Sequence, residues 1–308
     1  MAQNLYDQSC RYLVGLEPMG FFRWLLGLKA QEFALRGWLD TRAISLPGER
    51  DSTSDMVAHL VNLMEHGVPW ALLLEFQIAP DAGMFGRVLR HLGSIWQYVW
   101  PDEERGSRFN VGAAIINLTG RGICSQKMCW PGAGLTTDLG VIERNLEYER
   151  ADDLLIGVES GSWPRSLLPL IPLMIHGNAT DLIDKWTLLA GAEPDTRRRN
   201  DYAAIALLFA ERVGSRDVWN DKLKGWNVTE SAFINEFIAK GEAKGEAKGE
   251  AKGRTGTLLE LIQEKFQSVP RDLEANILGT TDIGRLRTFL SAALKANTLE
   301  EFRAACGL

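Results

Sequence analysis

The amino-acid sequence predicts an α/β fold: a mixed sheet flanked by helices, then a helical region, a low-complexity linker and a small all-α domain. In the first half of the chain, segments with helical periodicity alternate with short apolar runs that are typical of buried strands. From residue 178 onward, helical periodicity dominates. Residues 239–253 repeat Ala, Lys, Gly and Glu with a strict period of four, which indicates a linker between two folded parts.

Residues 5–40 are predicted to be helical. Their apolar side chains recur at spacings of three and four, as on the buried face of an amphipathic helix. Pro18 and Gly20 interrupt this pattern, so we expect a break between a first and a second helix.

Two apolar segments predict a β-hairpin. The first covers residues 56–63 and the second residues 70–78, and the turn between them lies at residues 65–69. Two strands joined by so short a loop are most simply antiparallel.

Glu75 and Gln77 are the polar residues of the second strand. Because side chains alternate along a strand, both share one face with Leu73. An ionised carboxylate on a central strand is costly unless a metal ion or an arginine pairs with it. Asp55 lies at the start of the first strand, so the hairpin brings it close to Glu75 and Gln77. Such oxygen ligands are suited to Mg2+ or Mn2+. The residues of the opposite face are expected in the core: Leu72, Leu74, Phe76 and Ile78.

Three further elements are expected to complete the sheet and cover it. The sequence predicts a helix from Met84 to Tyr98 and strands at residues 109–118 and 138–146. Residues 152–156 fit either a helix or a strand. The alternation of helix, hairpin, helix and strand favours a mixed sheet with helices on its faces.

Arg87 lies one helical turn from Arg90 and His91, so the three side chains can share a face. Two interpretations of Arg87 stay open: it contacts a substrate phosphate, or it forms a structural bridge with Asp81 or Glu75. For Arg90 and His91, a solvent-facing position is favoured.

The motif Asp55 … Glu75-Phe76-Gln77 resembles the catalytic signature of the PD-(D/E)XK nuclease superfamily, in the variant with Gln in place of Lys. The longer run from Leu72 to Leu92 resembles the recombination-promoting nuclease and transposase family of bacteria. In that family, a strand ending in Glu-x-Gln is followed by an Asp, a Met and an Arg that opens a helix. The resemblance covers the first half of the chain.

This resemblance implies a restriction-endonuclease-like sheet. It also implies that Asp55, Glu75 and the main-chain carbonyl of Phe76 bind Mg2+ or Mn2+. The catalytic residues would be Asp55, Glu75 and Gln77, with Gln77 in place of the Lys that orients the attacking water. Gln can donate and accept hydrogen bonds but cannot carry the proton or the positive charge. His59 is either a substitute base or a partly buried packing residue.

The second half of the chain is predicted as helices and a linker. The three arginines at 197–199 are either a phosphate contact or a solvated charged turn. The predicted parts are a nuclease-like domain with a helical extension (residues 1–238), a Gly/Glu/Ala/Lys linker (239–254) and a small helical domain (255–308). The last part resembles a helical domain of unknown function that often ends members of the same family.

The 308-residue chain has a formal net charge of −6, which counts against non-specific coating of nucleic acid but allows a local basic site. Its 4 Cys form no CxxC pair, so a zinc ribbon is not expected. The N-terminus has no signal-peptide pattern, and the apolar residues 167–175 are far fewer than the roughly 20 that a membrane span needs. We therefore expect a cytoplasmic protein.

The acidic pair and the family resemblance together predict a Mg2+-dependent endodeoxyribonuclease. The resemblance implies that it acts on DNA in recombination or transposon movement. Cleavage of both strands would require a homodimer or two encounters. The alternative is a catalytically inactive module with the nuclease fold that binds DNA or another protein.

Overall fold

The computed structural model describes residues 2–40, 56–101, 107–280 and 282–308. The chain divides into two compact units, Met1–Ile234 and Asn235–Leu308, which are described separately. The first unit contains the predicted mixed sheet and most of the helical extension.

The sheet of the first unit has the strand order β1-β2-β3-β4-β7. β1, β2 and β3 are antiparallel neighbours, whereas β4 and β7 run parallel to β3. A mixed sheet was expected, and the hairpin of β2 and β3 is confirmed. The strands are β1 (Phe33–Trp38), β2 (Met56–Asn62), β3 (Val68–Gln77), β4 (Asn110–Asn117) and β7 (Ile142–Asn145).

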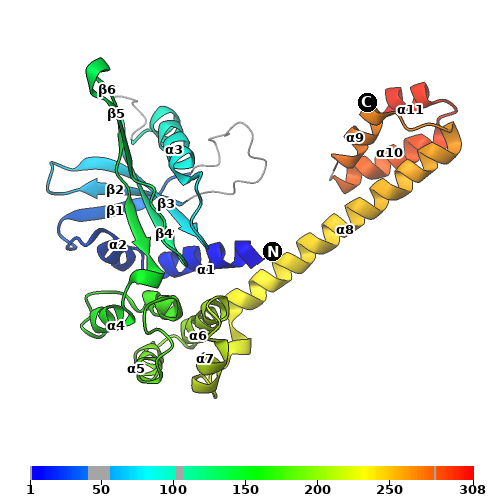
Figure 1. The fold of residues 1–308 in the computed structure, drawn as a ribbon. Helices are drawn as coiled ribbons and strands as arrows, with labels where there is room; N and C mark the ends of the chain where they lie inside the picture. Colours follow the sequence, from blue (N-terminus) through cyan, green and yellow to red (C-terminus); the bar gives the residue numbers. More distant parts are fainter. Residues whose placement is uncertain (1, 41–55, 102–106, 281) are drawn as a thin grey trace. The chain divides into compact units, whose positions relative to one another are not determined.

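Helices cover both faces of this sheet. α1 (Ala2–Leu16) and α2 (Pro18–Leu26) lie on one side, and α3 (Met84–Tyr98) lies on the other (Figure 1). Leu72, Leu74 and Phe76 of β3 pack toward α1 and α2, as the alternation predicts. Leu73 packs in the α3 cluster. α3 connects the parallel strands β3 and β4, which is the usual crossover between such strands.

The predicted helix over residues 5–40 is wrong in its last part. The break between α1 and α2 is confirmed, with Pro18 in the first turn of α2. α2 ends at Gly27, whose φ of 66° is easily adopted only by glycine. Residues 33–38 then form β1, because pairing with β2 outweighs a local pattern that also fits a helix.

A second, two-stranded sheet was not predicted. It consists of β5 (Gln126–Trp130) and β6 (Leu135–Leu139), joined through the 3-10 helix η1 (Pro131–Ala133). The predicted strand over residues 138–146 therefore divides between the end of β6 and β7.

The rest of the first unit is helical. Residues 152–156 belong to a helix, and the buried Trp186 and Trp219 pack edge to face in the same core as the α1 and α2 side of the sheet. The α-helices are α4 (Ala151–Glu159), α5 (Thr180–Gly191), α6 (Thr196–Arg212) and α7 (Arg216–Lys222). The 3-10 helices are η2 (Leu146–Tyr148), η3 (Arg165–Leu173) and η4 (Val228–Glu230).

The second unit is all α. α8 (Ala232–Phe266) runs without interruption through the four-residue repeat, where only partial helix was expected. Ala, Lys and Glu are strong helix formers, and they offset the cost of the repeated glycines. The remaining helices are α9 (Arg271–Leu278), α10 (Ile283–Lys295) and α11 (Leu299–Cys306).

Side chains at both ends of a four-residue segment cap the start of α11. Thr298 accepts a hydrogen bond from the Glu301 N–H group, and the Glu301 carboxylate accepts one from the Asn297 N–H group. Among the described helices, none is long and apolar enough to cross a membrane.

Candidate functional site

Glu75 lies on the face of β3 that α3 covers. Its neighbours on this face, Leu73 and Ile115, belong to the buried cluster that contains Val88 and Leu92 of α3. Glu75 itself is only 6% exposed. A carboxylate in these surroundings has lost most of its hydration, so cations or hydrogen-bond donors must compensate for this loss when it is ionised.

Gln77 follows Glu75 on the same face, and its Nε2 atom donates to Oε2 of Glu75 over a long 3.5 Å. The Gln77 main-chain carbonyl accepts from the Leu118 N–H group at 2.8 Å, on the β4 side of the strand. Because successive carbonyls of a strand point to opposite neighbours, the Phe76 carbonyl points to the β2 side. The described part of β2 begins at Met56, which pairs in register with Leu74.

Asp55 lies outside the described residues. The structure thus shows the surroundings of Glu75, Gln77 and Phe76, while the contribution of Asp55 stays a prediction. Within the described parts of the chain, no three His, Cys, Asp or Glu side chains gather as a metal-binding group.

His91 is buried, so the predicted solvent-facing position is wrong. It is 4% exposed, and its Nδ1 atom lies 3.9 Å from Oε1 of Glu75. Arg90, its neighbour in sequence, is exposed as expected. The signal for His91 was its position on the apolar stripe of α3, whose buried members are Met84, Val88, His91, Leu92 and Ile95.

Arg87 forms an ion pair with Asp81 at the start of α3. Both side chains are about one third exposed, so this bridge lies at the surface and is not buried. Asp81 also accepts a hydrogen bond from the Gly83 N–H group at 2.8 Å, which fixes the entry to the helix. Of the two acids that the sequence suggested as partners of Arg87, Asp81 forms the ion pair.

A polar network beside the candidate site was missed from the sequence. The register places Asn117 of β4 next to Gln77 of β3. The Asn117 Nδ2 atom donates to Glu143 at 3.2 Å and to Asn145 at 2.9 Å. The Gly122 N–H group also donates to Asn145, at 2.8 Å. These contacts join β4, β7 and the following loop, so they stabilise the edge next to Gln77. Single polar residues are common near the ends of strands, so the sequence alone does not indicate that these side chains form a network.

His59 packs away from Glu75. Its ring meets Phe109 edge to face with centroids 4.9 Å apart, and burial, together with the charge of Arg36, lowers the pKa of His59. It pairs in register with Ala71, which precedes Glu75 by roughly 13 Å of strand rise. This geometry favours the packing interpretation over a substitute base.

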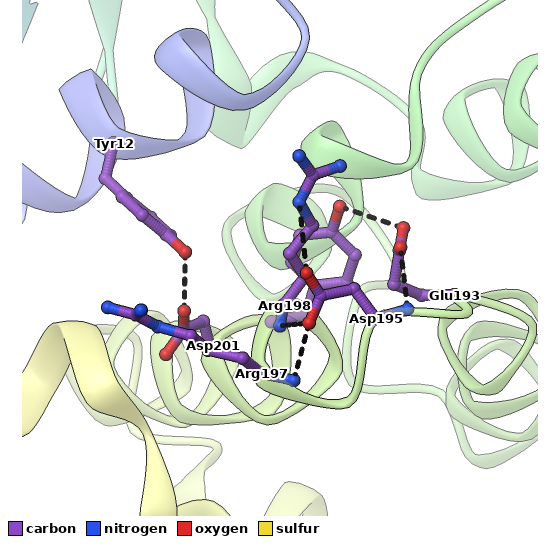
Figure 2. Close-up of polar contacts among 7 residues, drawn as sticks. Tyr12, Glu193, Asp195, Arg197, Arg198 and Asp201 are labelled. Carbon is purple, nitrogen blue, oxygen red and sulfur yellow. Dashed lines mark hydrogen bonds and ion pairs between the residues drawn. The ribbon is translucent and has the colours of Figure 1, made fainter.

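Asp195 caps the start of α6, next to Arg197 and Arg198 (Figure 2). Asp195 accepts hydrogen bonds from the N–H groups of Arg197 at 2.8 Å and Arg198 at 3.3 Å. The guanidinium of Arg199 donates to Thr196 at 3.2 Å. These contacts favour a solvated charged turn over a phosphate site.

Four groups therefore lie together at the end of β3: the Glu75 carboxylate, the Gln77 amide, the Phe76 main-chain carbonyl and the His91 imidazole. Carboxylate and carbonyl oxygens with a nitrogen ligand form a donor set that suits a divalent cation. No family model, curated protein or solved structure matches this chain.

Proposed function

We propose that the protein is a metal-dependent DNA endonuclease with a restriction-endonuclease-like core. The observation that carries this proposal is the burial of Glu75 at the end of β3, beside Gln77 and a Phe76 carbonyl that points to the β2 side. A buried acid at the end of a sheet strand, with polar groups around it, is typical of a functional site and costly in a core that serves packing alone. The mixed sheet with helices on both faces supports the same family of folds.

The residues present fit a divalent cation. Glu75 offers carboxylate oxygens and Phe76 a carbonyl, and Asp55 is the sequence neighbour of Met56, where β2 starts. Oxygen ligands of this kind hold Mg2+ or Mn2+. The Gln77 amide carries no charge, so it leaves the negative charge of Glu75 available to the ion.

When bound, the ion would supply the activated water and the positive charge that phosphodiester hydrolysis requires. The chain itself would hold the metal through Asp55, Glu75 and Phe76. Gln77 would orient the attacking water by hydrogen bonding, without taking its proton. Arg87 would hold a DNA phosphate at the start of α3, in exchange for its contact with Asp81.

Nicking of supercoiled plasmid DNA with Mg2+ or Mn2+ tests this proposal. The wild type should nick the plasmid, and both Asp55→Asn and Glu75→Gln should lower the rate by about a hundredfold or more. The matched control is Glu159→Gln, because Glu159 is an exposed acid of the same unit that pairs with Lys185 at 2.6 Å. Equal nicking by all four proteins would remove Glu75 from the mechanism.

A second candidate function is a catalytically inactive module that binds DNA or protein. The observation in its favour is the β5–β6 hairpin, which exposes Met128, Trp130 and Leu135. Trp130 and Leu135 are direct cross-strand partners, so they form one apolar surface. A folded wild type that nicks no plasmid with either metal would favour this module.

The place of the activity in recombination or transposon movement follows from the family resemblance alone. We propose a cytoplasmic protein that acts on DNA, with a homodimer as one way to cut both strands. Sedimentation at twice the monomer mass, together with linear plasmid that forms without prior build-up of the nicked form, would support the dimer.

A further inference from the structure

His91 takes a position on α3 that packing alone would give to an apolar residue. Its four companions on the buried stripe of the helix are aliphatic or Met, and it is as buried as they are. Burial of an imidazole costs free energy unless its nitrogen atoms bind a hydrogen-bond partner or a metal ion. One of these atoms, Nδ1, faces the carboxylate of Glu75. This arrangement points to a role beyond packing.

The separation between the two side chains agrees with a shared ion. The Nδ1 atom of His91 and the Oε1 atom of Glu75 are 3.9 Å apart. Two ligand atoms that each lie roughly 2.1 Å from one metal are about 3 Å apart at a right angle and about 4.2 Å apart on opposite sides. The observed separation falls between these limits, so one ion can touch both atoms with little movement.

We propose that His91 is a nitrogen ligand of the metal at Glu75, and that the site therefore binds first-row transition ions more tightly than Mg2+. This inference rests on the proposed metal site. Imidazole is a good ligand for transition ions, whereas Mg2+ keeps oxygen ligands and several waters. A site made only of Asp55, Glu75 and Phe76 would show a weaker preference.

The decisive measurement is electron spin echo envelope modulation of Mn2+ bound to the full-length protein. Mn2+ in the wild type should show modulation from a directly bound 14N nucleus. Protein labelled with 15N-histidine should lose this pattern and show the 15N pattern instead. This comparison uses unaltered wild-type sequence, so no variant needs to fold.

Variants then identify the histidine. The 14N signal should disappear in His91→Gln and persist in His59→Gln, which alters a half-buried histidine on the same face of the sheet. Calorimetric titration should show Co2+ binding tighter than Mg2+ in the wild type. This ratio should fall by about tenfold or more in His91→Gln.

Two results would overturn the inference, and they differ in what else they affect. Mn2+ that binds, depends on Glu75 and shows no nitrogen coupling would remove His91 as a ligand and leave the proposed endonuclease intact. Mn2+ that does not bind, or binds equally well to Glu75→Gln, would remove the metal site itself and with it the proposed function.

Discussion

The Tyr12 hydroxyl of α1 donates a hydrogen bond of 2.5 Å to the carboxylate of Asp201 on α6 (Figure 2). Asp201 is fully buried and also accepts from Ser231 at 2.7 Å and from the Phe233 N–H group at 3.2 Å. One side chain thus connects α1, α6 and the first turn of α8 within the first unit. Buried acceptors with several donors stabilise a unique packing, because the loss of one member leaves the others unpaired.

Asp201→Ala should destabilise the first unit strongly, by about 3 kcal/mol, because three donors lose their acceptor. Tyr12→Phe removes a single hydrogen bond and should cost about 1 kcal/mol. Urea unfolding followed by tryptophan fluorescence measures both values. Tyr98→Phe is the control and should change little, because Tyr98 is 61% exposed. A cost for Asp201→Ala no larger than that of Tyr12→Phe would contradict the connecting role.

Alkaline pH should weaken the fold through the same tyrosine. Burial, followed by the hydrogen bond to Asp201, raises the pKa of Tyr12 above its ordinary value of 10.0. As pH rises past about 10, the unfolded chain loses this proton and the folded chain keeps it, so the free energy of unfolding falls. The stabilisation is complete below pH 10 and is lost as pH rises toward the raised pKa.

Tyr12→Phe should therefore flatten this decline between about pH 10 and 11.5, by at most about 1.4 kcal/mol per pH unit. Some decline will remain, because burial and the nearby Glu193 also raise the pKa of Tyr202. Urea titrations at half-unit steps of pH measure the slopes. Identical slopes for wild type and Tyr12→Phe would show that Tyr12 titrates normally in the folded state.

Gly122 is required by the network beside Gln77. A Cβ atom at this position would lie 2.4 Å from Nδ2 of Asn117 and 2.5 Å from Oε1 of Glu143. Gly122→Ala should therefore push the loop off β4 and β7 and destabilise the fold by about 1–3 kcal/mol. Gly140→Ala, in the loop between β6 and β7, is the matched control, because a Cβ atom there meets nothing within 4 Å. Thermal unfolding compares the two variants, and equal melting temperatures would contradict the expected close approach.

Local signals predicted the central elements of the sheet, and tertiary contacts decided the others. The hairpin of β2 and β3 and the helix α3 carry clear periodicities with turns at their ends. β1 carries a pattern that also fits a helix, and its strand conformation comes from pairing with β2. All residues of β5 are exposed, so no alternation between core and solvent marks it as a strand.

Part of the candidate site could likewise be recognised from the sequence, and part of it depends on tertiary packing. Glu75 and Gln77 could be recognised because polar residues stand out in a buried strand. The contact of His91 with Glu75 depends on how α3 packs on β3, which a helical pattern does not specify. His91 lies on the apolar stripe of α3, which indicates burial. This pattern is stronger evidence for its position than its helical spacing from Arg87 and Arg90, which suggested a solvent-facing side chain.

Glycines in the four-residue repeat should weaken α8. Gly249 and Gly253 are exposed positions in the helix interior, and a Cβ atom at either would meet nothing within 4 Å. Replacement of each by Ala should stabilise the helix by about 1 kcal/mol. Gly307→Ala should have the opposite effect, because Gly307 ends α11 with a φ of 67° that disfavours Ala. Circular dichroism at 222 nm during thermal unfolding checks both signs.

Arg87 and Asp81 should affect DNA binding in opposite directions if the proposed phosphate contact is correct. Arg87→Ala removes one cation, so the dependence of log affinity on log salt concentration should become shallower by about 0.9. Asp81→Asn releases Arg87 from its ion pair and removes a negative charge, so it should tighten DNA binding at low salt. Fluorescence anisotropy with a labelled duplex in Ca2+, at several salt concentrations, measures both variants. As a solvent-exposed control, Arg150→Ala should leave the slope unchanged, since Arg150 precedes α4, which packs on the opposite side of the sheet from α3. An unchanged slope for Arg87→Ala would restrict Arg87 to its structural bridge with Asp81.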